Sequence, residues 1–473
     1  MDFKSTSNTT FFVCALSLLL TACKDAEIKL PSSGETANYP VVTQTKPTAS
    51  SEPGGGGQIS ASGGEKSICP DSGDSSSFDM VKKVSRSYNH FSVELYKSIA
   101  RDAKKERNIL ISPLSVAHSL SMVMAGARGN TLWEIGNVLD IDGTAPASTT
   151  REQYFSSALL HENINQFQNY LNEPSKPYTS TLSINNAYFP SRHIRIEQDF
   201  SKTLEQCYDS KITPVNFTEQ ENAAETINDW VFKATKGIIP KIINEEEIEI
   251  NTTSILTNAV YFKGLWKKPF DPKKTEKDFF SGAGNDGFVE TDMMYQSNAF
   301  KYAKSIRMDT AKIDVLELPY DEGRYSMFIF NPSGNDAQLD QLESEMTSDN
   351  LTNVMESVSQ ENEYTVSVLI PKFTLNDKLE LVDYLKYQGI NSAFGEGADF
   401  SRVSVIPNHI SNVEHFTNVE VDESGTVGAV ATSVSYTGRS MIDSFIVNGS
   451  FLFIIRDNNS KSILFIGRYV NAG

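Results

Sequence analysis

Apolar and polar positions follow helix-like and strand-like patterns that alternate irregularly from residue 78 to residue 473. Residues 256–262 and 364–370 predict β-strands, and the second run alternates with a period of two. Residues 116–126 predict a helix, because Ser112 and Pro113 before them suit a helix start and the glycines at their end suit a helix stop. Neither an internal repeat nor a linker-like break interrupts this region. The patterns therefore predict a single α+β domain.

An isolated run of residues with the composition of a β-strand lies near the C-terminal end of this domain. Residues 425–438 contain no charge and no proline, and most of their side chains are small or β-branched, which suits a β-strand. Charged and turn-forming residues flank the run, with Asp422 and Glu423 before it and Arg439 after it. The pattern favours a segment that can form a strand but need not be paired, with a basic residue at its far end. An ordinary interior strand of an antiparallel sheet is the alternative.

The N-terminal residues predict export. Residues 11–20 form an apolar stretch that is too short to span a bilayer and has the length of a signal-peptide core. The stretch ends in Leu20-Thr21-Ala22-Cys23, which resembles the lipobox of bacterial lipoproteins. This resemblance implies a signal peptide over residues 1–22 and a lipid-anchored Cys23 in the outer membrane or at the cell surface. A plain secretory peptide, and hence a secreted protein, is the alternative.

Residues 23–77 predict a flexible tether, because they are rich in Ser, Gly, Pro and Thr and have few large apolar side chains. The four cysteines do not predict a disulfide framework. Cys14 leaves with the signal peptide and Cys23 is assigned to the lipid, so that Cys69 and Cys207 remain. Cys207 lies in an amphipathic stretch and is predicted to be a buried thiol.

Charge and residue types exclude several classes of function. The net charge of −18 and a pI near 4.9 argue against nucleic-acid binding. None of the six histidines belongs to a metal-binding HExxH pair, and no glycine-rich loop carries a P-loop lysine. Ser112, Ser115 and His415 could suggest a hydrolase, but the serines do not lie in a nucleophile elbow and a helix start explains them. The expectation is therefore no metal, no cofactor and no enzymatic activity.

A series of short motifs, in order and at family spacing, resembles the serpins, a family of serine protease inhibitors. The motifs are Ile111-Ser112-Pro113-Leu114-Ser115, Gly126-Ala127-Arg128-Gly129-Asn130-Thr131, Ile227-Asn228-Asp229-Trp230-Val231, Thr257-Asn258-Ala259-Val260-Tyr261-Phe262-Lys263-Gly264, Leu318-Pro319-Tyr320, Ile370-Pro371-Lys372-Phe373 and Gly467-Arg468. The resemblance covers residues 78–473. It implies a single α+β domain with a large central β-sheet, further sheets, about eight to nine helices and an exposed reactive-centre loop.

The resemblance also assigns the loop. Its hinge would consist of Glu423, Gly425, Thr426, Gly428, Ala429, Val430, Ala431 and Thr432. The family spacing places the scissile bond at Arg439-Ser440, and the distance to Ser450-Phe451-Leu452-Phe453 matches the family distance to a Pro-Phe-Leu-Phe signature. The proline of that signature is missing here, and Val430 stands where alanine is commoner.

Two further groups of residues follow from the resemblance alone. A buried polar cluster called the shutter, under the central sheet where two strands must part, would contain Ser112, Ser115, Asn258 and His415. At the top of the sheet, the breach would contain the ion pair of Lys372 with Glu423, beside Trp266.

The function implied is a suicide-substrate inhibitor that traps a trypsin-like protease as an acyl-enzyme while the cleaved loop inserts into the central sheet. None of the side chains that would face the core on insertion is charged; they are Thr426, Gly428, Val430, Thr432 and Val434. The alternatives are a non-inhibitory serpin that acts as a binding module and a surface protein that proteases merely cleave. A monomer is expected. Heparin activation is not implied, because residues 151–170 contain few basic side chains.

Overall fold

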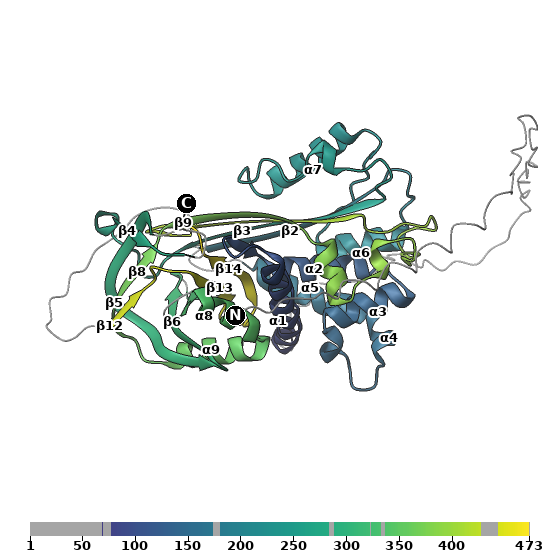
Figure 1. Ribbon diagram of the computed structural model, residues 1–473. Coiled ribbons are helices and arrows are strands. Elements are labelled where there is room, and N and C mark those ends of the chain that lie inside the picture. Colours follow the sequence, from purple (N-terminus) through teal and green to yellow (C-terminus); the bar gives the residue numbers. More distant parts are fainter. Residues whose placement is uncertain are drawn as a thin grey trace, which may run out of the picture. The chain divides into compact units, whose positions relative to one another are not determined.

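Two β-sheets and the helices that pack against them make up the described part of the chain (Figure 1). The computed structural model describes residues 69, 77–173, 180–282, 288–321, 323–332, 336–426 and 443–472, and all of them belong to one compact unit that begins at Glu65. The predicted signal peptide, Cys23 and all of the predicted tether except Cys69 and Ser77 lie outside the described residues.

Helices cover both sheets. The described residues form ten α-helices, one more than the upper figure implied by the resemblance: α1 (Ser77–Asp102), α2 (Pro113–Met124), α3 (Gly129–Val138), α4 (Arg151–Phe155), α5 (Ala158–Asn172), α6 (Gln198–Tyr208), α7 (Gln220–Ala234), α8 (Asp336–Glu345), α9 (Ser348–Gln360) and α10 (Val382–Gln388). Four short 3-10 helices accompany them: η1 (Ile141–Thr144), η2 (Glu245–Glu247), η3 (Pro272–Lys274) and η4 (Ser392–Phe394). The predicted α+β class is confirmed.

Five strands form the central sheet: β2 (Ser180–Pro190), β3 (Ser254–Leu265), β9 (Phe373–Glu380), β10 (Asn412–Val421) and β11 (Gly425–Thr426). β3 pairs antiparallel with β2 on one edge and parallel with β10 on the other, and β9 pairs antiparallel with β10. The two-residue β11 pairs antiparallel with the end of β3, beyond the last residue that β10 pairs. β3 and the predicted strand over residues 364–370 are confirmed.

The second sheet has nine strands in the order β1-β14-β13-β7-β6-β5-β8-β12, with β4 paired to β5. Its strands are β1 (Ile109–Ile111), β4 (Glu276–Phe280), β5 (Val289–Met308), β6 (Ala311–Pro319), β7 (Tyr325–Pro332), β8 (Tyr364–Pro371), β12 (Asp443–Ile446), β13 (Phe451–Asp457) and β14 (Ile463–Tyr469). Every residue of β13 and β14 is buried. α1, α8 and α9 pack against this sheet.

Both faces of the central sheet are covered, which explains why β3 is almost entirely buried. α2, in which every residue is buried, lies under one face together with α5 and α6, and α7 lies over the other (Figure 1). On the α7 face, Ile255 and Ala259 of β3 pack in one apolar cluster with residues of that helix. Because side chains of a strand alternate between faces, Leu256, Asn258 and Val260 point to the α2 side.

The prediction of a buried thiol at Cys207 is wrong. Cys207, near the end of α6, forms a disulfide with Cys69, and their Cα atoms lie 5.3 Å apart. Both side chains are buried. The partners are 138 residues apart in sequence, and only the fold brings them together. The bond fixes Cys69, which falls inside the segment predicted as a tether, to the folded body.

Candidate functional site

The seam between β3 and β10 is the place where predicted site residues meet. We use the word seam for the parallel pairing of residues 255–261 of β3 with residues 412–418 of β10. Beyond Asn418, β10 continues to Val421 without β3 as its neighbour, and the chain then turns back. β11 occupies the edge of β3 at this point, with Gly425 opposite Leu265 and Thr426 opposite Gly264. Two residues of the predicted hinge are therefore already paired with β3 just beyond the Tyr261 end of the seam.

The turn into β11 depends on an aspartate and a glycine. The Oδ1 atom of Asp422 accepts hydrogen bonds from the backbone N–H groups of Ser424 and Gly425 at 2.8 and 3.1 Å. Gly425 has a φ of +153°, and a Cβ atom there would lie 2.1 Å from the carbonyl oxygen of Gly264. Only glycine can take this conformation so close to β3, which gives the predicted hinge glycine a steric reason.

Thr426 is fully buried, with 0% of its surface exposed. Its Oγ1 atom lies 3.0 Å from the hydroxyl of Tyr320, and the ring of Tyr320 stacks on Trp266 with centroids 4.6 Å apart. The sequence named Thr426 and Trp266, but it gave Tyr320 no role. The remaining predicted hinge residues, Gly428, Ala429, Val430, Ala431 and Thr432, and the predicted reactive bond Arg439-Ser440 lie outside the described residues.

Lys372 and Glu423 meet at the top of the sheet, with Nζ and Oε2 2.9 Å apart. Thr275 donates a 2.7 Å hydrogen bond to the other carboxylate oxygen of Glu423. Burial favours the neutral acid, but the hydrogen bonds from Lys372 and Thr275 outweigh it and hold the pKa of Glu423 below its ordinary value. The hydrogen bond to Glu423 in turn raises the pKa of Lys372. Both groups are charged at neutral pH.

Trp266 fastens the same turn through hydrogen bonds. Its indole Nε1–H donates to the carbonyl of Asp422 at 3.0 Å, and its backbone N–H donates to the carbonyl of Ser424 at 2.9 Å. The backbone N–H of Phe270 donates to the carbonyl of Glu423 at 2.8 Å. The three predicted breach residues therefore lie together, around the turn that directs the chain from β10 into β11.

The four predicted shutter residues also lie together, in one hydrogen-bonded network that passes through the backbone of Ser112. His415 stands directly opposite Asn258 across the seam. The Nε2 atom of His415 accepts a 3.1 Å hydrogen bond from the backbone N–H of Ser112. The hydroxyl of Ser115 lies 2.9 Å from the carbonyl oxygen of Ser112 and 3.2 Å from Oδ1 of Asn258. A residue that the sequence did not single out, Ser119, accepts from Nδ2 of Asn258 at 3.0 Å.

Ser119 follows Ser115 by one helical turn, so the i, i+4 spacing on α2 was the signal that could have identified it. Ser112 precedes α2 as predicted, but its side chain makes no capping hydrogen bond. Complete burial lowers the pKa of His415 to about 3, so its imidazole is neutral. Since Nε2 is an acceptor, the ring proton resides on Nδ1, which is buried and has no hydrogen-bond partner among the described residues.

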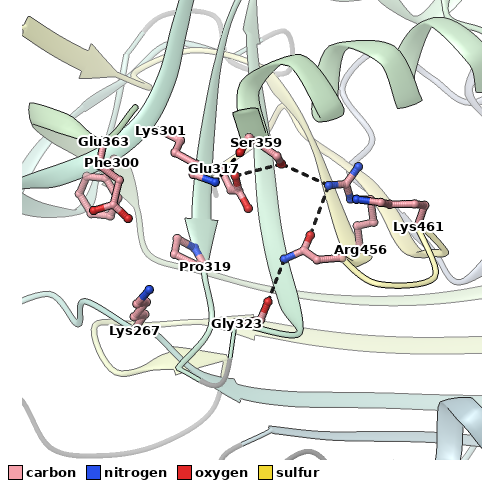
Figure 2. A pocket seen from close by; sticks show the side chains of 11 residues that line it. Lys267, Phe300, Lys301, Glu317, Pro319, Gly323, Ser359, Glu363, Arg456 and Lys461 are labelled. Atoms are coloured by element: carbon pink, nitrogen blue, oxygen red, sulfur yellow. Dashed lines mark hydrogen bonds between the residues drawn. The ribbon is translucent and has the colours of Figure 1, made fainter. Parts of the chain in front are cut away.

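A cavity of about 260 Å³ lies elsewhere, against the second sheet. In Figure 2, Arg456 points toward Ser359, which also contacts Glu317. Arg456 pairs with Glu356 at 2.7 Å, and Lys461 pairs with the same carboxylate at 2.9 Å. None of the predicted site residues lines this cavity. Within the described ranges, no cluster of side chains suits a metal ion, and no helix is long and apolar enough to cross a membrane.

Comparison with known proteins identifies the family. The model of the family described as serpin (serine protease inhibitor) matches residues 86–472. The chain belongs to the serpin family. It is 33% identical over 400 residues to the leukocyte elastase inhibitor of Xenopus tropicalis, covering 82% of this chain and 99% of the relative. It is 30% identical over 383 residues to ovalbumin of Dromaius novaehollandiae, covering 80% and 97%.

Solved serpin structures share the fold. The structure of native protease nexin-1 with heparin superposes with a TM-score of 0.72 at 26% identity, covering 83% of this chain and all of that one. The expectation of no enzymatic activity needs a correction, because relatives of this serpin are named as inhibitors and serpins act as suicide substrates in the reaction of a protease. A serpin enters the covalent chemistry of peptide-bond cleavage as a reactant that is consumed.

Proposed function

We propose that this serpin inhibits trypsin-like proteases as a suicide substrate that is cleaved at Arg439-Ser440. The burial of Thr426 in the sheet is the observation that carries the proposal, because it gives the entering strand a defined starting register on β3. A trypsin-like protease binds an arginine in a pocket that contains a buried aspartate. Cleavage after Arg439 leaves the protease on the carbonyl carbon and frees the loop to extend β11.

We infer the position of each inserted loop residue by continuing the register of β11 along β3. Continued along β3, it pairs Gly428 with Phe262, Val430 with Val260 and Thr432 with Asn258. Phe262, Val260 and Asn258 belong to the face that packs on α2. The loop residues that this register assigns to that face are uncharged. This agrees with the low tolerance of a core for unpaired charge.

Insertion has to separate His415 from Asn258. Their side chains have different direct partners among the described residues: His415 accepts from the backbone of Ser112, whereas Asn258 bonds Ser115 and Ser119. A strand that enters between them adds about 4.8 Å to their separation without having to break a direct bond between their side chains. Thr432 is the loop residue that the register brings beside Asn258.

Protease titration tests the proposal. We expect that Arg439→Ala lowers the rate of covalent complex formation with trypsin by about 100-fold or more, because the charged contact in the primary pocket is lost. Arg439→Lys is the matched control and should retain most of that rate. The products are read on a denaturing gel, where a covalent complex, a clipped chain and an unchanged chain are separated. An unchanged rate in Arg439→Ala shows that the scissile bond lies elsewhere.

A non-inhibitory role is the second candidate. Ovalbumin, a relative of this chain, represents serpins without inhibitory activity. Such a protein gives a clipped chain or no reaction in the same titration, with no covalent complex at any protease concentration. The absence of charged side chains from hinge residues 425–432 favours the inhibitory function.

We also propose that Cys23 carries the lipid that anchors the protein on the outer side of a membrane. The disulfide between Cys69 and Cys207 supports export, because disulfides persist in oxidising compartments. Cys23→Ser should move the protein from the detergent phase to the aqueous phase in a phase-partition experiment. Cys14→Ser is the control and should leave the partition unchanged. Persistence of the Cys23→Ser variant in the detergent phase contradicts the assignment.

A further inference from the structure

A buried acid and a buried hydroxyl face each other across the seam, on the side opposite to the shutter. Glu414 of β10 pairs with Thr257 of β3. Their neighbours on the same face, Phe416 and Ala259, pack with the apolar cluster of α7. Glu414 is 3% exposed and Thr257 is 0% exposed. Neither Oε2 of Glu414 nor Oγ1 of Thr257 has a hydrogen-bond partner within the described part of the chain.

The surroundings of Glu414 disfavour its charge. Burial is the largest effect and raises the pKa of Glu414 to about 7. The charges of Glu380, its cross-strand neighbour on β9, and Glu247 of η2 act in the same direction, and this value is the net result. Lys378 of β9 and a 3.4 Å hydrogen bond from Asn412 to Oε1 of Glu414 oppose them. Lys378 is itself bound to Glu247, with Nζ and Oε1 2.7 Å apart. On β3, the residue opposite is the uncharged Thr257.

We propose that Glu414 makes the opening of the β3–β10 seam dependent on pH, with its ionised form favouring separation of the two strands. The proposal deepens the inhibitory function proposed above and rests on it. In the closed sheet, ionisation leaves a carboxylate oxygen without a protein donor in a buried site, which is unfavourable. Separation of the strands relieves this cost, since the entering strand brings new polar groups to the position.

The register of β11 specifies which group the entering strand brings. Residue by residue, it pairs Ser433 with Thr257, so that a serine hydroxyl arrives between Thr257 and Glu414. A hydroxyl can donate to the carboxylate and accept from the threonine at the same time. In the expanded sheet, such a hydroxyl would give a partner to each of the two oxygen atoms that lack one among the described residues.

The direction of the pH effect follows from the raised pKa. The neutral acid stabilises the closed sheet, and this stability is complete below the ordinary pKa of a glutamate and is lost as the pH rises through about 7. Insertion should therefore compete better with deacylation at pH 8.5 than at pH 6. The rate of deacylation also changes with pH, but that change belongs to the protease and is common to all variants.

The experiment compares the full chain with its Glu414→Gln variant between pH 6 and pH 8.5. The ratio of trapped to clipped serpin with trypsin is measured at each pH and divided by the ratio of the variant, which cancels the pH dependence of the protease. We expect this quotient to rise several fold with pH. Glu420→Gln on the same strand is the matched control and should follow the wild type.

Unfolding of the intact chain in urea provides a second readout that needs no protease. Its midpoint in the wild type should fall with rising pH relative to Glu414→Gln. Glu414→Leu, which also lacks the charge, should match the glutamine variant and replaces it if that variant does not fold. Parallel pH profiles for wild type and variant in both measurements overturn the proposal. Absence of a covalent complex at every pH, with the unfolding difference retained, refutes the inhibitory function but keeps Glu414 as the pH-dependent group of the closed sheet.

Discussion

At the residue scale, two side chains decide how the chain enters the central sheet. Gly425 permits a backbone conformation within van der Waals contact of β3, and Thr426 places its hydroxyl against Tyr320. The sequence predicted Thr426 as the first inserting residue. The structure shows that this step has already occurred in the intact chain, so that Thr426 belongs to the core before any cleavage.

Thr426→Arg should convert the protein from an inhibitor into a substrate. Tyr320 and β3, the described neighbours of Thr426, offer an arginine no carboxylate, and an unpaired buried charge costs about several kcal/mol. β11 should leave the sheet, whereas attack on Arg439-Ser440 should continue. Trypsin titration should then yield clipped serpin and active protease.

Ser424→Arg is the control, because Ser424 is only half-buried and lies in the turn before β11. It should remain an inhibitor. Thermal unfolding adds a check: the cleaved wild type should melt higher than the intact chain, and cleaved Thr426→Arg should gain less. An equal melting temperature for cleaved and intact wild type shows that the loop does not insert.

At the element scale, the sequence predicted β3 and β8 well because their own side chains determine them. Residues 256–262 are buried on both faces of the sheet, and residues 364–370 carry the alternation of a strand with two different faces. The start of α2 was equally local, since Pro113 follows Ser112. Its end at Met124 comes two residues before the predicted one.

Pairings between elements that are distant in the sequence could not be predicted from such local patterns. β11 is only two residues long, and its place depends on Trp266, Tyr320 and the close approach of Gly264. The resemblance to serpins supplied Lys372 with Glu423 and His415 with Asn258, which no local pattern connects. It did not supply Ser119 or the pairing of Glu414 with Thr257, because these contacts depend on how α2, β3 and β10 of this chain are aligned.

At the scale of the whole molecule, the disulfide is the longest covalent connection, joining residues 138 positions apart. A cross-link that closes so long a loop typically stabilises the folded state by about 2–4 kcal/mol. The double variant Cys69→Ala, Cys207→Ala should therefore unfold at a lower urea concentration than the wild type. Reductant should lower the midpoint of the wild type and leave that of the double variant unchanged. Identical midpoints for the two oxidised proteins contradict a stabilising role.

The disulfide also lies near one particular end of the central sheet. β2 pairs Ser180 with Gly264 at the end where β11 enters, and Pro190 with Ser254 at the other end, from which the chain leads into α6 and Cys207. Cys69 therefore joins the body through the helix that follows the far end of the sheet.

A strand that grows from β11 along β3 travels toward that same end. The register would pair Tyr436 with Ser254, the first residue of β3 and the last that the growing strand reaches. Arg439 lies three positions past Tyr436. In the proposed mechanism, a protease held on Arg439 would thus be carried along the length of β3, from the end at β11 to the end from which the chain leads into α6 and its disulfide.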